Sequence, residues 1–237
     1  MTGMKIHTLS TGVMGAGLTW LLWNPRPWPA DPVWDEYPVD DECSTYVVLV
    51  EHPEGRVLWD SGTPRGWEPR WTMAGVQDFF PLREPVDETG FLDTALAKLD
   101  LTPDDIDILV LPYLRFDHAS TGRLFDPAKT RILASAAELD RIKTTTERDG
   151  SDFDGLFING IAGDEEILPG IRVIQVPGHV MSLWVDLDRD GMKIFTCSAV
   201  HIADSRGSPE FAAALSETTD WTSNDESDRQ VVSAFAK

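Results

Sequence analysis

The sequence is poor in cysteine and in basic residues, and it has no long hydrophobic run. Its 237 residues include two cysteines and no CxxC pair, which argues against a cysteine-based zinc site and favours reduced thiols. The longest apolar stretches, Val13–Trp23 and Ile106–Leu114, fall short of the ~20 residues that a membrane-spanning helix needs. The amino terminus lacks the pattern of a secretion signal. We therefore expect a cytoplasmic protein with no membrane contact.

Lys and Arg residues are half as numerous as Asp and Glu: 20 against 40, a net charge of −20. Non-specific binding to phosphate groups needs a basic face, so this composition argues against nucleic acid as a partner. The acidic excess has two interpretations. It can be a solubility coat or an adaptation to a salty cytoplasm, or it can attract a cationic ligand or a basic partner protein.

The chain does contain many strand-like segments with helical ones between them. Alternating or continuous apolar residues predict strands over 4–10, 45–51, 55–60, 106–111, 130–134, 166–168, 171–176, 183–187 and 193–197. Helical spacing predicts helices over 90–100, 135–144, 211–215 and 225–236. Residues 67–81 and 112–121 are expected to be loops. The order favours an α+β fold with helices outside two sheets, in a single domain over 1–237.

Two short patterns add local detail to this prediction. His52-Pro53-Glu54-Gly55 between two strand segments predicts a β-hairpin. Ser135, followed three residues later by Glu138, has the spacing of a capping box and predicts the start of a helix.

Five segments along the chain resemble the N-acyl-homoserine-lactonase branch of the metallo-β-lactamase superfamily. In order they are Met4–Gly12 (MKIHTLSTG), Glu51–Gly62 (EHPEGRVLWDSG), Leu111–Thr121 (LPYLRFDHAST), Leu168–His179 (LPGIRVIQVPGH) and Ile194–His201 (IFTCSAVH). The resemblance spans nearly the whole chain. It implies an αββα sandwich, the metallo-β-lactamase fold, with the functional site at the edges of the sheets.

The resemblance also implies chemistry with two divalent metal ions, which activate a water molecule and polarise a carbonyl group. The family holds the metals with an HxHxDH cluster, a histidine in a TPGH-like segment, a bridging aspartate and a final histidine. Here Tyr113 and Arg115 stand in place of the two first histidines of the cluster, while Asp117 and His118 match its end. Ser198 matches the bridging aspartate, and no residue of the chain matches the final histidine.

The matching positions leave Asp117, His118 and His179 as the candidate metal ligands. Imidazole and carboxylate groups suit zinc or manganese, so we expect either no metal or at most one divalent ion per chain. Arg115 opposes metal binding because its guanidinium is always charged and repels a nearby cation. The alternative is that these residues are inherited scaffold, in which Asp117 pairs with Arg115 or loop amides and His118 makes an ordinary hydrogen bond.

Other residues of the resemblance have open roles. His201 could donate a proton, act as a substitute ligand or lie on the surface. Tyr113, Arg115 and Ser198 could line a new polar pocket, and Ser198 could be a nucleophile if His179 lies within reach as its base. Asp60, in an Asp-Ser-Gly turn, resembles a family aspartate that supports the ligand loop.

Two classes of function remain open from the sequence. The first is a non-catalytic or supporting subunit, paired with a homologous metal-binding subunit or with a second copy of itself. The second is a hydrolase of lactone, ester or activated ether bonds in a small-molecule substrate, with a mononuclear or metal-free site. A weaker third interpretation is a binding protein for a small anion at Arg115. Trp20, Trp23 and Trp28 suggest an interface or core packing near the amino terminus.

Overall fold

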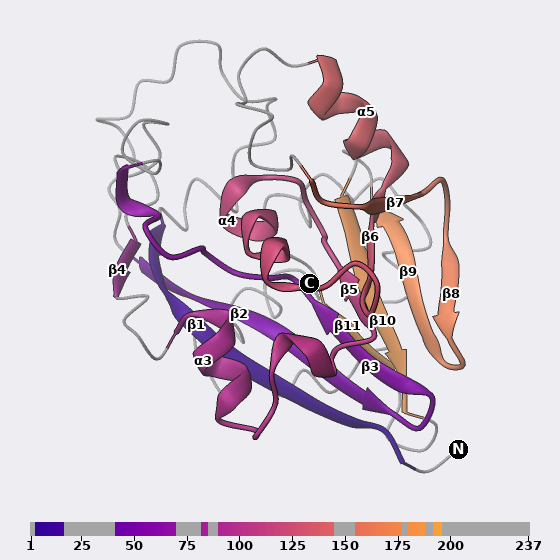
Figure 1. Cartoon of the computed structure of the whole chain (residues 1–237). Helices are drawn as coiled ribbons and strands as arrows, with labels where there is room; N and C mark the ends of the chain where they lie inside the picture. Colours follow the sequence, from indigo (N-terminus) through magenta and orange to yellow (C-terminus); the bar gives the residue numbers. More distant parts are fainter. Residues whose placement is uncertain are drawn as a thin grey trace, which may run out of the picture.

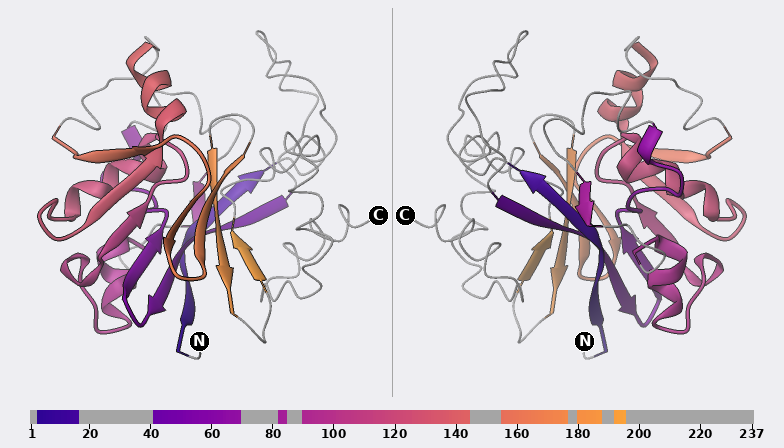
Figure 2. Two further views of the ribbon diagram at one scale, coloured as in Figure 1. Left: turned by 90° about the vertical axis from the view of Figure 1, so that its right-hand side faces the viewer. Right: turned by 90° about the vertical axis from the view of Figure 1, so that its left-hand side faces the viewer.

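The structure is a computed structural model that describes residues 3–16, 41–69, 82–84, 90–144, 155–176, 180–187 and 192–195. Within these residues the chain forms two β-sheets that face each other, with helices on one side (Figures 1 and 2). Residues 17–40, 70–81 and 196–237 are among those outside the described part. The predicted helices over 211–215 and 225–236, and the three tryptophans near the amino terminus, therefore stay predictions.

The larger sheet has seven strands in the order β4-β1-β2-β3-β5-β6-β7. Its strands are β1 (Lys5–Ala16), β2 (Asp41–His52), β3 (Gly55–Trp59), β4 (Leu82–Glu84), β5 (Ile108–Val110), β6 (Arg131–Ser135) and β7 (Ile158–Ile161). Neighbouring strands are antiparallel from β4 through β1 and β2 to β3, and they are parallel from β3 through β5 and β6 to β7. Strands β2 and β3 form the predicted hairpin, in which His52 pairs with Gly55.

The smaller sheet has four antiparallel strands in the order β11-β10-β9-β8. They are β8 (Glu165–Leu168), β9 (Ile171–Val176), β10 (Val180–Asp186) and β11 (Met192–Phe195). The sequence predicted all four strands, within a few residues at their ends.

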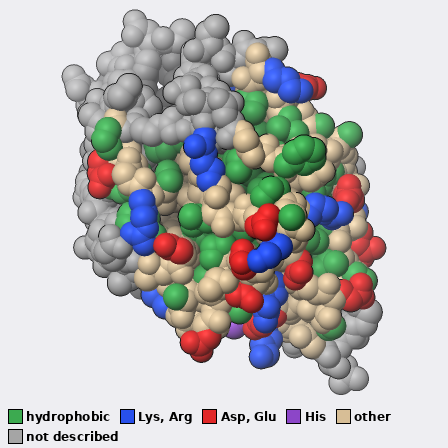
Figure 3. Space-filling view, in the orientation of Figure 1, with side chains coloured by type: hydrophobic (Ala, Val, Ile, Leu, Met, Phe, Trp, Pro, Cys, Tyr) green, Lys and Arg blue, Asp and Glu red, His purple; other side chains and the backbone are tan. Residues whose placement is uncertain are grey.

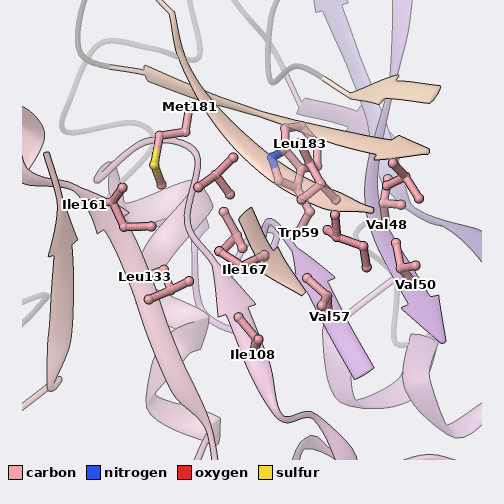
Figure 4. Close-up of a cluster of buried hydrophobic side chains, with 14 residues drawn as sticks. Val48, Val50, Val57, Trp59, Ile108, Leu133, Ile161, Ile167, Met181 and Leu183 are labelled. Atoms are coloured by element: carbon pink, nitrogen blue, oxygen red, sulfur yellow. The ribbon is translucent and has the colours of Figure 1, made fainter. Parts of the chain in front are cut away.

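One hydrophobic core fills the space between the two sheets (Figure 4). Alternate residues of the larger sheet, such as Val48, Val57 and Trp59, point into this space and meet Met181 and Leu183 of β10. The period of two along a strand explains why these residues share one face. The sandwich of two sheets is thus held by apolar side chains of strands that the sequence predicted.

A second core lies on the other face of the larger sheet, under the helices α3 (Leu92–Ala97), α4 (Phe116–Ala119) and α5 (Ala136–Thr144) (Figure 2). The 3-10 helices η3 (Pro103–Asp105) and η4 (Ser120–Leu124) lie in the connections. Strands β2, β3, β5 and β6 are buried on both faces. Their sequences are therefore continuous apolar runs without polar alternation, as is usual for covered sheets.

The loop prediction for residues 112–121 is wrong in its second half. Residues Phe116–Ala119 form α4, and η4 follows at Ser120. The segment is short and turns around buried polar side chains, so it has no apolar periodicity to signal a helix. Strands β4 and β7 were also not predicted, because each is short and lies at an edge of the larger sheet.

The capping-box prediction for α5 is wrong as well, although the helix itself is confirmed. The hydroxyl of Ser135 is buried without a hydrogen-bond partner. The carboxylate of Glu138 instead accepts the backbone N–H of Leu114 at 3.0 Å. Glu138 therefore binds the backbone of the irregular segment after β5, and this buried contact takes the place of a local capping hydrogen bond.

The described surface mixes charges of both signs. On the face in Figure 3, Lys and Arg side chains lie among Asp and Glu side chains, with hydrophobic groups between them. No helix in the described part of the chain is long and apolar enough to cross a membrane.

Candidate functional site

The candidate site lies where the neighbouring parallel strands β3 and β5 end at the same edge of the larger sheet. The backbone N–H of Asp60 donates to the carbonyl of Val110 at 2.9 Å, which ties the turn after β3 to the end of β5. The backbone N–H of Met181, in β10, donates to the carbonyl of Pro112 at 3.1 Å. Both sheets therefore help to position the segment that follows β5.

Asp60 organises the turn after β3. It adopts a left-handed conformation with φ of 69°, which favours Gly, Asn or Asp. Its Oδ1 accepts the backbone N–H groups of Ser61 at 2.6 Å and Gly62 at 3.0 Å, and its Oδ2 lies 2.7 Å from Nδ1 of His118. The hydroxyl of Ser61 donates to the carbonyl of His118 at 2.6 Å. The turn therefore forms hydrogen bonds with both the side chain and the backbone of His118.

Asp117 is buried and forms a two-pronged ion pair with Arg115. Nε of Arg115 donates to Oδ1 at 2.6 Å, and Nη2 donates to Oδ2 at 2.6 Å. The side chain of Asp117 is 7% exposed and that of Arg115 is 34% exposed. Burial opposes ionisation of Asp117, but the charges of Arg115 and His118 and the hydrogen bonds to Arg115 outweigh it and lower the pKa to about 2. The carboxylate is therefore charged and matched by an internal cation.

His118 lies between two carboxylates. Its Nδ1 faces Asp60, and its Nε2 is 3.7 Å from Oδ2 of Asp117. Burial favours the neutral imidazole, yet the charges of Asp60 and Asp117 and the hydrogen bond to Asp60 raise the pKa above its usual value. A histidine bonded through Nδ1 to a carboxylate is held in one ring orientation, with Nε2 directed to the other side.

The ring of Tyr113 contacts the side chains of His118 and Arg141. Its ring meets the ring of His118 in an edge-on arrangement, with centroids 6.4 Å apart. The guanidinium of Arg141, in α5, lies 5.2 Å from the centroid of the Tyr113 ring. Arg141 is also paired with Glu138, which is fully buried and binds the backbone of Leu114. Helix α5 thus supports the candidate site through a buried carboxylate, its arginine partner and an aromatic contact.

Among the described residues, Arg115 opposes a metal ion at Asp117 and His118. No group of three or more His, Cys, Asp and Glu side chains within the described ranges is arranged to hold a metal ion. Both oxygens of Asp117 are bound by Arg115, and a fixed guanidinium repels a divalent cation near it. Of the two candidate ligands that the structure describes, Asp117 and His118, only His118 has an atom, Nε2, that is directed away from its partner at Nδ1.

The structure brings together Tyr113, Arg115, Asp117 and His118, with Asp60 beside them. The ion pair of Asp117 with Arg115 agrees with the scaffold interpretation of these residues, and the contact of Asp60 with His118 agrees with the expected support of the loop. The other three expected residues, His179, Ser198 and His201, lie outside the described part of the chain.

Sequence reasoning missed three residues that shape this site. Ser61 could have been recognised from its place beside Asp60 in the turn. Nothing in the sequence indicated that Glu138 and Arg141 contribute to this site, because their contacts with the segment after β5 span more than twenty positions of the chain.

Comparisons with known proteins agree with this architecture. No protein-family model matches the chain. An N-acyl homoserine lactonase of Bacillus cereus is 25% identical over 162 residues, which cover 66% of this chain and 64% of the relative. The match therefore spans less than two thirds of the relative's length.

Solved structures show the same fold. The structure of an N-acyl homoserine lactone hydrolase with N-hexanoyl-L-homoserine at its catalytic metal centre matches with a TM-score of 0.65 and 21% identity, over 83% of this chain and 76% of that one. The dizinc quorum-quenching lactonase AidC matches with a TM-score of 0.59 and 13% identity, over 92% and 85%. The chain has the metallo-β-lactamase fold, with one mixed sheet, one antiparallel sheet and helices, which places it in the α+β class. Its sequence is similar to N-acyl homoserine lactonases, from which it has diverged far.

Proposed function

We propose that this chain is a lactonase-like member of the metallo-β-lactamase fold group whose dinuclear metal site is degraded. In this proposal it acts as a non-catalytic or supporting subunit, paired with a metal-competent homologue or a second copy. The observation that carries the proposal is the ion pair in which Arg115 binds both oxygens of the buried Asp117. Arg115 occupies one lone pair on each oxygen, and its fixed positive charge repels a divalent ion from the lone pairs that remain.

The neighbouring positions support the same conclusion. Tyr113 and Arg115 stand where the resemblance expects imidazoles, and neither offers a neutral nitrogen for a metal. Ser198, at the position of the bridging aspartate, has no carboxylate. Several ligands of each metal are thus missing together, and metal affinity falls steeply with each ligand lost.

The retained scaffold supports a role for the chain as a folded partner. Both hydrophobic cores are formed by buried strands, and the fold matches a metal-dependent lactone hydrolase over most of the chain. We further propose that the protein works in the cytoplasm, since its two cysteines suit a reducing compartment.

A second candidate function is supported by the contact of Asp60 with His118. A carboxylate at Nδ1 fixes the ring and directs Nε2 toward a metal, a water molecule or a substrate. On this alternative, Asp117, His118 and His179 hold at most one zinc or manganese ion, or act without metal. The substrate would be a small molecule with a lactone, ester or activated ether bond. This alternative requires Asp117 to leave Arg115 for the metal-bound form.

Metal analysis and turnover of the purified wild-type chain separate the two functions. We expect less than about a tenth of an equivalent of zinc or manganese per chain, because three-ligand sites hold metal tightly and this one is blocked. We also expect no hydrolysis of lactones, esters or activated aryl ethers above the buffer rate. The matched control is the Bacillus cereus lactonase, purified and assayed in the same way.

Close to one tightly held equivalent, together with turnover, would overturn the proposed function. The alternative then makes its own prediction. Replacement of both His118 and His179 by alanine should remove the metal and the activity together, and unchanged activity would reject it.

Proposed pairing has a direct test. The chain and a metal-competent lactonase are expressed together, and their association is followed by size-exclusion chromatography with light scattering. A mixed complex or a self-dimer supports the supporting-subunit role. A monomer in both cases contradicts it.

A further inference from the structure

The charge of the candidate site is balanced inside the protein. Asp117 is buried beside the guanidinium of Arg115, and a buried carboxylate needs a cation or several donors to compensate it. Arg115 supplies this cation from two residues away, through two parallel hydrogen bonds of 2.6 Å each. A planar guanidinium matches a carboxylate in this geometry better than an ammonium group does.

We propose that Arg115 is a built-in cation that takes the structural place of a divalent metal ion in this fold. It neutralises Asp117 and thereby holds α4 against the turn after β3, so that the segment is ordered without metal. This inference rests on the proposed loss of the dinuclear site. It concerns the stability of the chain, however, and it is tested by a different measurement from metal content or turnover.

The contacts around Arg115 explain how one charge can hold the segment. The carbonyl of Arg115 accepts the N–H groups of His118 at 3.0 Å and Ala119 at 2.9 Å, which start α4, while its side chain binds Asp117 in the first turn. His118 then continues the connection to Asp60. A continuous series of contacts thus connects the start of α4 with the end of β3, through Arg115, Asp117, His118 and Asp60.

The guanidinium of Arg115 and a metal ion at Asp117 and His118 would repel each other at close range. Oδ2 of Asp117 and Nε2 of His118 are 3.7 Å apart. An ion bound about 2.0–2.2 Å from each atom could lie between them. Nη2 of Arg115 already donates to that same Oδ2. Removal of Arg115 should therefore uncover a latent cation site at Asp117 and His118.

Thermal unfolding of the wild type and of Arg115→His tests this inference, in EDTA and in zinc chloride. The wild-type Tm should be the same in both solutions. In EDTA, Arg115→His should unfold about 5–10 °C lower, because Asp117 has lost its fixed cation. Zinc should raise the Tm of Arg115→His by at least several degrees, since the introduced imidazole would join Asp117 and His118 as a ligand.

The control for the zinc effect is Arg115→His combined with Asp117→Asn. This variant keeps the new imidazole but lacks the carboxylate, so zinc should leave its Tm nearly unchanged. The inference is overturned if Arg115→His is as stable as the wild type in EDTA, or if zinc stabilises the variant and its control equally.

A double-mutant cycle keeps the inference testable if Arg115→His does not fold. Asp117→Asn, Arg115→Met and the combination of both are compared with the wild type. Loss of either charge alone should lower the Tm, whereas loss of both should cost less than the sum of the single losses. Additive losses would reject the pair as the source of stability. A wild type that binds no metal and turns over no substrate, yet shows additive losses, would reject this inference and leave the proposed function standing.

Discussion

Nδ1 of His118 lies 2.7 Å from Oδ2 of Asp60, and this contact joins two residues that are 58 positions apart in the chain. It links the turn after β3 to α4, at the edge where two parallel strands end side by side. The same carboxylate also binds two backbone N–H groups of its own turn. Asp60 is therefore the point at which the two segments of the candidate site are fixed to each other.

Replacement of Asp60 should destabilise the protein according to the acceptors that are lost. Asp60→Ala removes three hydrogen bonds and leaves buried donors unpaired, so we expect a loss of about 3 kcal/mol in the free energy of unfolding. Asp60→Asn keeps one acceptor oxygen and tolerates a positive φ, and should cost about half as much. Urea unfolding followed by circular dichroism measures both. Equal losses for the two variants would contradict a role for the side-chain oxygens.

The buried pair of Glu138 and Arg141 should matter far more than an exposed pair on the same helix. Glu138→Gln leaves Arg141 without its full charge partner and weakens the bond to Leu114, so we expect a loss of about 2–4 kcal/mol. Asp140 and Lys143 form the matched control, because they also pair at i and i+3 but are 78% and 69% exposed. Lys143→Met should change the stability by less than about 0.5 kcal/mol. Similar losses at both sites would show that burial does not set the strength of these pairs.

The pKa of Asp117 predicts acid sensitivity. The pKa falls from 3.8 to about 2 on folding, so the folded state binds this proton more weakly than the unfolded state does. The carboxylate therefore contributes stability above about pH 4 and loses this contribution as the pH falls toward 2. The lost part amounts to about 2 kcal/mol.

Urea unfolding at several values between pH 2 and pH 6 checks this prediction, with Asp117→Asn as the comparison. The variant should be less stable at pH 6 and should lose less stability on acidification than the wild type. Parallel curves for the two proteins would place the proton uptake elsewhere.

Alanine substitutions at Gly62 and Gly66 separate two effects on stability. One is backbone strain, and the other is a steric contact with Thr11. Both glycines have a positive φ, of 67° and 70°, which an alanine tolerates poorly. A β-carbon at Gly62 would lie 3.3 Å from Cγ2 of Thr11, whereas one at Gly66 would meet nothing within 4 Å. Gly66→Ala should cost about 1 kcal/mol and Gly62→Ala about 2 kcal/mol or more. If the two variants unfold at the same urea concentration, the Thr11 contact adds nothing.

Much of the fold could be predicted from the sequence. The apolar runs of β2, β3, β5 and β6 predicted strands, and the structure shows that both faces of these strands are covered. The hairpin at His52–Gly55 was readable from local turn chemistry. The order of five family-like segments predicted the metallo-β-lactamase fold, which the structural comparisons confirm.

Part of the candidate site could also be predicted from the sequence, since it involves residues that are close together in the chain. Arg115 and Asp117 are two positions apart with opposite charges, and their pairing was one of the two interpretations that the sequence left open. Whether this pair forms could be learned only from the folded chain, because a guanidinium two residues away can as well extend into solvent.

The contacts between distant segments could be learned only from the folded chain. Glu138 has the spacing of a helix cap, yet it binds Leu114 because α5 packs over the segment after β5. His118 finds Asp60 because β3 and β5 are parallel neighbours and end at one edge. Local propensity fixes which residues form strands and helices, but the burial of a charge depends on which segments the fold brings together, and that is a property of the whole chain.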